Sequence, residues 1–421
     1  MSVASIEFIF LLLVCGAFFF HLPGRGPRLA AFSVANALAL WSLLPGEAQA
    51  PKSFWPSLAA LAVFLVSGYV VAMALRRRPS GWLLSGYLLA LVAAFLVLKE
   101  YEYVQWALPM SLIKHPIGII GLSYMLFRQI HFIVDAMQDQ IEGGTFCAYL
   151  NYQLNLFGIL SGPIQRFQDF HEFWQNPQPI IADRHELLKT ILRINWGVLK
   201  LAGIGTACFY AYTLSSSTLD QVSRGFLVQL SAPKKLIYFA IMFYSFPAYL
   251  YFNFSGYCDI VIAGARLFGI RMPENFDQPY LARNMIDYWN RFHRTLSHWI
   301  RDYIFMPLYK GTVERTPNLA EPLSIVFMFL ALFLAGVWHG STINWVVFGI
   351  LNGIGVGAVK LWELAIIRAR GRKGHKEYLK NPQIRAAAIF VNLNFACLTY
   401  LFFPTDMVKT LHAIEVLFRS A

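Results

Sequence analysis

The sequence predicts an all-α protein that crosses a membrane many times. Of its 421 residues 57% are hydrophobic and only 14% are charged, and its mean hydropathy is +0.50. Soluble domains carry about 25% charged residues, so this composition excludes an ordinary soluble fold. The hydrophobic residues also fall into long runs separated by short polar stretches, which is the pattern of a polytopic helical membrane protein.

The runs have the length that a transmembrane helix requires, which is roughly 20 apolar residues. We expect about ten or eleven such helices, some of them tilted or re-entrant. They begin near residues 4, 29, 54, 82, 117, 190, 236, 257, 323, 342 and 386. The first run, residues 8–20, has no basic residue before it and no small-residue cleavage site after it. We therefore expect a retained span rather than a cleaved signal peptide.

Lysine and arginine in the short loops indicate how the chain is oriented. The first loop carries Arg25 and Arg28 and the third carries three arginines at residues 76–78, whereas the second and fourth loops show no basic excess. Cytoplasmic loops hold the excess of basic residues. The alternation therefore predicts a protein of the inner (cytoplasmic) membrane with its N-terminus outside and its odd-numbered loops in the cytoplasm.

A strongly basic stretch lies near the end of the chain. Residues 368–385 hold seven lysines and arginines against one glutamate, a net charge that is half of the formal +12 of the chain. We interpret it as a cytoplasmic loop beside anionic lipid headgroups. The alternative is a docking surface for an acidic carrier protein. The basic balance gives no reason to expect nucleic acid as a partner.

The sequence shows no signature of metal, disulfide or nucleotide chemistry. The cysteines have no ligand spacing and lie mostly in apolar sequence, which is typical of small buried hydrophobic side chains. A phosphate-binding Walker loop and a dinucleotide fingerprint are both missing. We expect no metal and no bound cofactor. The cysteines are Cys15, Cys147, Cys208, Cys258 and Cys397.

One histidine lies inside an apolar run. Trp338, His339 and Gly340 are in the middle of residues 327–350, which are otherwise almost entirely apolar. An imidazole exposed to hydrocarbon would cost several kcal/mol, so at this depth it must face the protein interior or a water-filled cavity. His339 is therefore the first candidate for chemistry.

A polar segment interrupts the apolar runs in the second half of the chain. Residues 271–310 contain too many charged and amide groups to cross lipid as an ordinary span. We expect a helix that starts near Asn284 or Asp287 and lies at the membrane interface or along a cavity. On it, Asp287 and Arg291 are one turn apart and can form an ion pair.

On that helix the spacing places His293 among hydrogen-bonding groups. Trp289, His293 and Ser297 share one face, and Asn290 lies beside His293 one turn back. These neighbours favour a catalytic or substrate-orienting role for His293. The alternative is an amphipathic helix on the lipid headgroups, with His293 and His298 simply solvated.

Three other segments combine polar residues with glycine or proline. Residues 116–128 and 161–168 each have glycine, proline and an arginine at the edge of an apolar run, which is typical of a broken or re-entrant helix. Residues 251–259 add small residues and Asp259, whose nearest basic partners in sequence are Arg266 and Arg271. We favour a structural ion pair over a catalytic acid for Asp259.

In content and order these segments resemble the membrane-bound O-acyltransferase (MBOAT) family. They are most similar to its bacterial members that O-acetylate alginate or transfer D-alanine to teichoic acid. The segments are Gly121-Leu-Ser-Tyr, Ser161-Gly-Pro-Ile-Gln-Arg-Phe, Tyr251-Phe-Asn-Phe-Ser-Gly-Tyr, Pro273-Glu-Asn-Phe, Tyr288-Trp-Asn-Arg-Phe-His-Arg-Thr-Leu-Ser-His-Trp and Trp338-His-Gly. The resemblance implies one membrane-embedded domain around a central tunnel. N-terminal helices would occupy residues 1–110, the motif-bearing core residues 116–345, and C-terminal helices residues 346–421.

The resemblance also implies a site. The histidine of the family's Trp-His-Gly motif is its invariant active-site residue, which corresponds to His339. A second histidine lining the same tunnel corresponds to His293. We expect supporting or tunnel-lining roles for Asn290, Ser297, Trp338, Arg166, Tyr257 and Asp259.

Acyl transfer from a thioester to a hydroxyl needs a base for the hydroxyl proton and a donor that stabilises the oxyanion. A neutral imidazole can be that base, and which of the two histidines acts as the base stays open. The resemblance implies acetyl-CoA or an acyl-carrier protein as the thioester donor on the cytoplasmic side. The acceptor would be an extracytoplasmic protein or polysaccharide, and membrane lipids would surround the chain.

Two departures from the family pattern concern the acyl group. Residues 305–311 lack the Gly-Gly-Asn-Arg of the alginate-type proteins, which favours D-alanyl transfer. Arg166 follows a glutamine where the D-alanyl proteins have aspartate, which favours acetyl transfer. We favour acetyl transfer to an extracytoplasmic polysaccharide, with D-alanyl transfer to teichoic acid as the alternative. Outside the family, a transporter, a flippase or an export-complex scaffold are the competing functions.

The end of the chain predicts a short amphipathic helix on the outer face of the membrane, within residues 406–421. Packing at the interface is favoured over a contact with an extracytoplasmic partner. The apolar residues are Met407, Leu411, Ile414, Val416 and Leu417.

Overall fold

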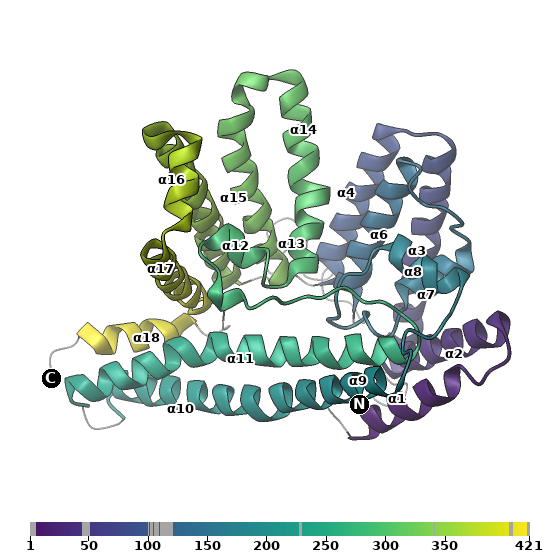
Figure 1. Ribbon diagram of the computed structural model, residues 1–421, viewed down its shortest axis with the longest axis horizontal. Coiled ribbons are helices and arrows are strands. Elements are labelled where there is room, and N and C mark those ends of the chain that lie inside the picture. Colours follow the sequence, from purple (N-terminus) through teal and green to yellow (C-terminus); the bar gives the residue numbers. More distant parts are fainter. Residues whose placement is uncertain are drawn as a thin grey trace. The chain divides into compact units, whose positions relative to one another are not determined.

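The computed structural model of the chain is all-helical, as the sequence predicts (Figure 1). It describes residues 6–43, 51–99, 101, 104, 109, 121–226, 230–340, 342–403 and 407–418. The chain forms two compact units. Unit 1 consists of Met1–Val198 and Tyr257–Glu274, and unit 2 consists of Leu199–Gly256 and Asn275–Ala421.

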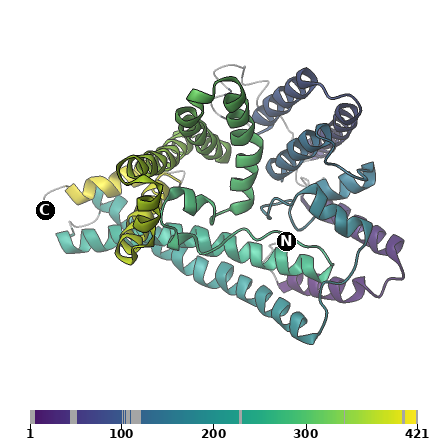
Figure 2. The ribbon, with the colours of Figure 1, turned by 45° about the horizontal axis from the view of Figure 1, so that its top comes forward.

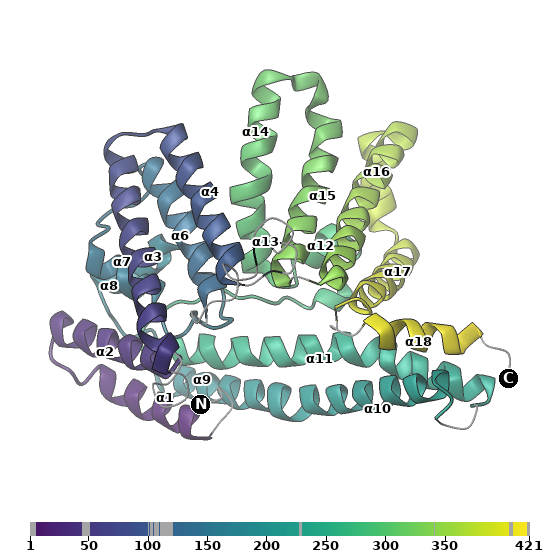
Figure 3. The same cartoon turned by 180° about the vertical axis from the view of Figure 1, so that it is seen from behind.

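Among the residues that the structure describes, unit 1 contains eight labelled helices and the end of a ninth. They are α1 (Ile6–Phe19), α2 (Arg25–Leu43), α3 (Pro51–Arg77), α4 (Gly81–Leu98), α6 (Leu122–Met137), α7 (Phe146–Gln153), α8 (Phe167–Gln175), α9 (Arg184–Val198) and the last part of α11 (Ala232–Leu267). The helices α3, α4 and α6 pack side by side (Figure 3). The short helices α7 and α8 contact each other, and α7 also packs on α3 and α6.

Aromatic side chains hold α6, α7 and α8 together. The ring of Phe132 lies 4.7 Å from that of Tyr149 and 4.9 Å from that of Phe167, and all three side chains are buried. Burying a ring of this size stabilises the fold by roughly 1.5–3 kcal/mol. This packing brings the first residues of α8 against α6.

Unit 2 begins in the middle of a long helix and contains the C-terminal half of the chain. Its helices are η2 (Leu199–Gly205), α10 (Thr206–Ser223), the first part of α11, η3 (Pro279–Leu281), α12 (Met285–Trp289), α13 (Arg294–Ile300), η4 (Arg301–Phe305), α14 (Met306–Arg315), η5 (Pro317–Leu319), α15 (Ala320–His339), α16 (Ile343–Lys380), α17 (Pro382–Tyr400) and α18 (Met407–Phe418). The helices α14, α15, α16 and α17 each contact the next (Figure 2).

Glycines let α15 and α16 approach to backbone contact. A Cβ atom at Gly336 of α15 would overlap the backbone of Gly349 in α16, and one at Gly349 would lie 2.7 Å from the carbonyl oxygen of Phe333. Only glycine fits at such a crossing. The crossing sets the direction in which the end of α15 points.

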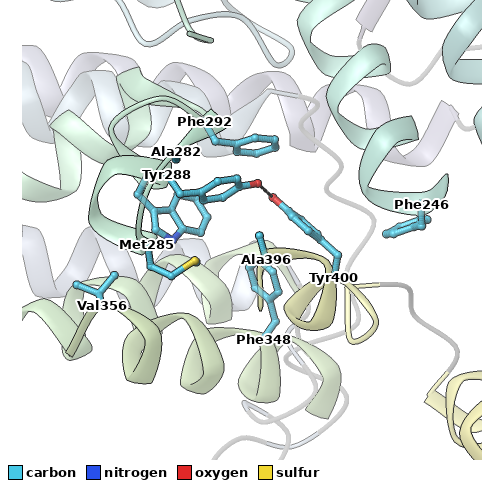
Figure 4. Close-up of a cluster of buried hydrophobic side chains, with 10 residues drawn as sticks. Phe246, Ala282, Met285, Tyr288, Phe292, Phe348, Val356, Ala396 and Tyr400 are labelled. Carbon is cyan, nitrogen blue, oxygen red and sulfur yellow. Dashed lines mark hydrogen bonds between the residues drawn. The ribbon is translucent and has the colours of Figure 1, made fainter. Parts of the chain in front are cut away.

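A buried aromatic cluster holds α12 against α16 and α17 (Figure 4). The hydroxyl groups of Tyr288 in α12 and Tyr400 in α17 are hydrogen-bonded at 2.8 Å. Trp289 Nε1 donates to Asn352 Oδ1 of α16 at 3.2 Å. The polar atoms of these rings are therefore paired inside the core, as buried tyrosine and tryptophan require.

Six of the predicted spans are confirmed as helices that are long and apolar enough to cross a membrane among the described residues. They are Phe54–Arg77, Gly81–Leu98, Arg184–Ser223, Ala232–Leu267, Pro317–His339 and Ile343–Lys380. The separate span predicted near residue 257 is wrong, because α11 runs through it and continues past Pro247 without a loop. The predicted start near residue 117 lies outside the described residues, and α6 begins at Leu122.

Two smaller predictions needed correction. The basic stretch is largely helical rather than irregular, because α16 continues to Lys380 with one break at Gly371 (φ +68°) and α17 begins at Pro382; arginine and lysine are good helix formers. Its place on the cytoplasmic side stays a prediction. Cys258 and Cys397 are buried as expected, but Cys15 and Cys147 are exposed. In a membrane protein apolar sequence faces outward as well as inward, so it does not by itself predict burial.

The predicted C-terminal helix is confirmed as α18. Its buried face is formed by Thr410, Ala413 and Val416, which pack on α10 and α11 side chains, whereas Leu411 of the predicted apolar face is 53% exposed. Small side chains occupy the buried face because they allow a close approach of the helix.

Candidate active site

His339 is the last residue of α15, and its ring lies among aromatic side chains. The ring centroid is 4.7 Å from that of Trp338 and 5.7 Å from that of Phe403. The ring of Trp345 lies 5.4 Å away and nearly parallel, at an angle of 20°. A Cβ atom at Gly340 would overlap Nε1 of Trp345, so glycine is the residue that fits after His339.

His293 is buried, with 3% of its surface exposed, and it does not lie within a helix. Its backbone has φ +50° and ψ +48°, the left-handed conformation, between the end of α12 at Trp289 and the start of α13 at Arg294. The predicted continuous helix is therefore wrong at this point. A non-glycine residue in this conformation is uncommon and costs of order 1 kcal/mol or more.

The helix breaks because a distant segment takes its backbone hydrogen bonds. Asp277 N donates to the carbonyl oxygen of Arg291 at 2.9 Å, and Arg294 N donates to that of Asn275 at 3.0 Å. Phe276 and Phe292 form an isolated antiparallel bridge between these bonds. The groups that would have continued the helix are thus paired with residues 275–277.

The side chain of Asn275 gathers three groups from this junction. It is fully buried, and its Oδ1 lies 3.2 Å from Nδ1 of His293, 3.2 Å from the backbone nitrogen of Thr295 and 2.9 Å from Thr295 Oγ1. The ring of Phe254 packs edge-on against that of His293 at 4.9 Å. The imidazole is therefore held on one nitrogen and along one face.

A row of aromatic rings runs from the junction of His293 to His339. Phe292 directly precedes His293, and its ring lies 6.0 Å from that of Tyr400. The ring of Tyr400 lies 5.6 Å from that of Phe403, which is beside His339.

Burial lowers the pKa of His293 to about 3, and the charge that His339 can carry has a smaller effect in the same direction. His293 is therefore neutral at pH 7.

The other site residues predicted in unit 2 have different surroundings. Ser297 is in the first turn of α13, where its backbone nitrogen donates to the carbonyl oxygen of His293 at 3.1 Å. Asn290 is exposed at the C-terminal cap of α12, so the expectation that it lies beside His293 on one helix is wrong. Trp338 packs on His339 as described above.

The remaining predicted residues belong to unit 1. Arg166 caps the start of α8, with Nη1 3.3 Å from Nδ1 of His131. Tyr257 is buried, and its hydroxyl accepts a hydrogen bond from the backbone nitrogen of Ser161 at 3.3 Å. Tyr257 thus holds the backbone at Ser161, and Arg166 contacts the imidazole of His131.

Asp259 forms an ion pair, but with a different partner from the two predicted. Its Oδ1 lies 2.9 Å from Nε of Arg193, and the same guanidinium binds Glu274 through both terminal nitrogens at 2.7 and 2.6 Å. Arg266 instead pairs with Glu186 at 3.0 Å. The basic residues nearest in sequence are not the partners of Asp259, because α9 packs beside α11 and supplies Arg193 from 66 residues away.

Sequence reasoning missed Asn275 and Trp345 as parts of the site. Asn275 belongs to the Pro-Glu-Asn-Phe segment, so the signal was present, but its contact with His293 depends on a pairing 18 residues apart. Within the described part of the chain, no group of three histidine, cysteine or acidic side chains is close enough to hold a metal ion. The chemistry available here is that of two imidazoles in an aromatic setting.

The region that contains this site is similar in sequence to known proteins. The sequence pattern of "MBOAT, membrane-bound O-acyltransferase family" matches residues 122–401, which include both histidines. The chain is 29% identical over 299 residues to the "Teichoic acid D-alanyltransferase" of Streptococcus thermophilus, a match that covers 68% of each protein.

Two other relatives carry acetyltransferase names. The chain is 28% identical over 260 residues to the "Probable alginate O-acetylase AlgI" of Pseudomonas fluorescens, covering 58% of this chain and 45% of that protein. It is 25% identical over 389 residues to the "Peptidoglycan O-acetyltransferase" of Helicobacter pylori, covering 84% of this chain and 68% of that protein. The similarity therefore extends to relatives with two kinds of acyl group.

Proposed function

The chain belongs to the membrane-bound O-acyltransferase family, and from that premise we propose that it transfers an acetyl group from a cytosolic thioester to hydroxyl groups of an extracytoplasmic polysaccharide. Family membership makes it a multi-pass membrane acyltransferase, which removes the transporter, flippase and scaffold alternatives. The acyl group, the acceptor and the roles of individual residues are the content of the proposal.

The reaction is proposed to take place at the histidine pair of unit 2. A neutral imidazole takes the proton of the acceptor hydroxyl while its oxygen attacks the thioester carbon. His293 is neutral at pH 7 and held by Asn275, and His339 is held by stacking on Trp345. General-base assistance of this kind contributes about 10²- to 10⁴-fold to the rate.

The surroundings of the two histidines carry the preference for acetyl. The rings that contact His339 are those of Trp338, Trp345 and Phe403, and the ring of Phe254 packs on His293. An acetyl group is small and uncharged, so it can be buried among such rings without the cost of burying a charge. A D-alanyl group brings an ammonium, which must be paired or solvated when it is buried.

D-alanyl transfer to teichoic acid is the second candidate. The match to the Streptococcus thermophilus protein covers more of both chains than the match to the alginate protein. Aromatic faces can stabilise an ammonium by roughly 0.5–2 kcal/mol, so the tryptophans beside His339 offer a D-alanyl group partial compensation.

The remaining parts of the proposal follow from the direction of transfer. The donor is acetyl-CoA or an acyl-carrier protein on the cytoplasmic side, and the acceptor is an extracytoplasmic polysaccharide or a protein that passes the acyl group on. The N-terminus is outside the cytoplasmic membrane. Arg166, Tyr257 and Asp259 support the fold of unit 1, and Ser297 and Trp338 support the histidines.

A competition between thioesters tests the acyl group. The purified protein in lipid nanodiscs receives acetyl-CoA, an acetyl-carrier thioester or a D-alanyl-carrier thioester, and free thiol is measured over time. We expect release from an acetyl thioester at least ten times faster than from the D-alanyl thioester. Faster release from D-alanyl would replace the proposal with the second candidate. His339→Ala is the inactive control, and Asn392→Ala, which removes a buried amide bonded to the carbonyl oxygen of Ala282, controls for general damage.

A further inference from the structure

We infer that Asn275 is a positioning residue that fixes the tautomer of His293, with the proton on Nδ1 and the lone pair on Nε2, the form in which the imidazole can take the proton of the acceptor hydroxyl. This inference rests on the proposed acyl transfer. It concerns the step in which the proton of the acceptor hydroxyl is taken up, as opposed to the stabilisation of the oxyanion. The geometry that points to it is the meeting of three groups at one oxygen atom.

The orientation of the Asn275 amide is determined by a group that can only donate. The backbone N–H of Thr295 has no lone pair to offer, and it points at Oδ1 at 3.2 Å. The atom that it faces must therefore be the oxygen rather than the nitrogen of the amide. The hydroxyl of Thr295, at 2.9 Å, can donate to the same oxygen.

The orientation of the amide decides the tautomer of the imidazole. Because Oδ1 of Asn275 can only accept, Nδ1 of His293 at 3.2 Å must carry the proton. A neutral imidazole has one protonated nitrogen, so the lone pair of His293 is on Nε2. Burial keeps the ring neutral, as its low pKa indicates.

A second histidine could either accept the hydroxyl proton or donate to the oxyanion, and this tautomer permits only the first role at Nε2. A neutral imidazole with its lone pair on Nε2 cannot donate from that atom to a developing oxyanion, but it can accept the proton of a hydroxyl. In the reaction the acceptor oxygen bonds to the acyl carbon and the carbon–sulfur bond breaks. The hydroxyl proton passes to Nε2 and leaves with the thiolate as free thiol.

The competing explanation is that Asn275 only holds the junction together. It bonds to the first turn of α13, and its carbonyl oxygen accepts from Arg294 N. Loss of a purely structural residue lowers stability but leaves the protonation pattern of the histidine unchanged. The test therefore reads the tautomer itself as well as the rate.

The first measurement is the ¹⁵N spectrum of histidine-labelled full-length protein in nanodiscs, with His293 assigned by the signal lost in His293→Gln. We expect the wild type to show protonated Nδ1 and unprotonated Nε2. Asn275→Ala should give a mixture of both tautomers. Asn275→Asp keeps the acceptor oxygen and adds a negative charge, so it should keep the tautomer and raise the pH at which His293 takes up a proton by roughly 1 to 3 units.

The second measurement is a double-mutant cycle in thiol release, with whichever thioester the wild type uses. Asn275→Ala should lower the rate about 10²- to 10⁴-fold. In the His293→Gln background it should cause no further loss, because Asn275 acts through His293. Asn392→Ala, the matched buried amide, should lose no more than a few-fold and keep the wild-type tautomer.

The outcomes separate this inference from the proposed function. An unchanged tautomer in Asn275→Ala, or losses that multiply in the double mutant, would overturn the positioning role. A wild type that uses D-alanyl rather than acetyl thioesters overturns the acetyl proposal only, since the spectrum and the cycle do not depend on the acyl group. Retained activity in Asn275→Asp, with a rate that falls at a higher pH than in the wild type, supports the positioning role.

Discussion

Two buried histidines, one in each unit, show how the same side chain serves structure in one place and chemistry in another. His131 is 1% exposed and His293 is 3% exposed. Nε2 of His131 accepts the backbone N–H of Phe167 at 2.9 Å, and its Nδ1 lies 3.2 Å from Oδ2 of Asp135. Both nitrogens of His131 are thus committed to the fold of unit 1.

His293 differs in the groups that its nitrogens meet. Its Nδ1 faces the oxygen of a neutral amide instead of a carboxylate. The backbone around it is left-handed, whereas His131 lies within regular α6. Burial alone therefore does not mark a catalytic histidine. The partner of Nδ1, a neutral amide at His293 and a carboxylate at His131, is the difference between the two that can be tested.

The largest effect is expected from the histidines of unit 2. His339→Ala and His293→Ala each remove an imidazole from the site and should lower thiol release per folded protein about 10²- to 10⁴-fold. The folded fraction, measured by size-exclusion chromatography in detergent, should stay near that of the wild type. Full activity in either variant would remove that histidine from the mechanism.

The opposite pattern is expected for unit 1. His131→Ala leaves the buried N–H of Phe167 without its acceptor, at about 1–3 kcal/mol, and removes one of the partners of Asp135. The thermal unfolding midpoint should fall, while the rate of the protein that remains folded should change by less than about tenfold. A loss of rate as large as that of His339→Ala, at an unchanged unfolding midpoint, would mean that His131 also acts in catalysis and would contradict its structural role.

The low pKa of His293 predicts a stability that depends on pH. The unfolded chain takes up a proton on this ring below pH 6.5, but the folded protein does so only near pH 3. The stabilisation is therefore complete above pH 6.5 and is lost as the pH falls, by about 2 kcal/mol at pH 5. The midpoint difference between pH 8 and pH 5 should shrink in His293→Gln. An equal difference in both proteins would mean that His293 is not buried in its neutral form.

A smaller effect is expected from the glycine after His339. Gly340→Ala adds one methyl group against Nε1 of Trp345, and relief of that overlap costs about 1–3 kcal/mol. The displaced tryptophan should lower the rate roughly tenfold, and the protein should lose stability by about that 1–3 kcal/mol. Gly81→Ala, which meets open space at the start of α4, is the matched control and should behave as the wild type.

The sequence predicted those features that depend on neighbours along the chain. The apolar runs at residues 323 and 342 became α15 and α16, and His339 stands between them at the end of α15. Asp287 and Arg291, one helical turn apart, form their ion pair at 2.7 Å. Composition and spacing are sufficient for such features because they depend only on residues close together along the chain.

The features that were missed depend on residues far apart in the sequence. The break at His293 arises from the pairing of Phe276 with Phe292, and the partner of Asp259 is Arg193 on another helix. A helical spacing argument includes neither contact. The same limit hid Asn275, whose role needs the fold that brings it to the ring of His293.

The most direct test of the central claim is the ester content of the cell envelope and exopolysaccharide in strains that carry the wild-type protein, His339→Ala, His131→Gln or a deletion. Mass spectrometry identifies the acyl group released by mild base, and blotting measures the protein in the membrane. We predict that acetate esters disappear in the deletion and in His339→Ala and persist with His131→Gln in proportion to the protein present. Acetate esters that persist in His339→Ala, with the protein in the membrane at wild-type amounts, would contradict a histidine-centred acetyl transfer.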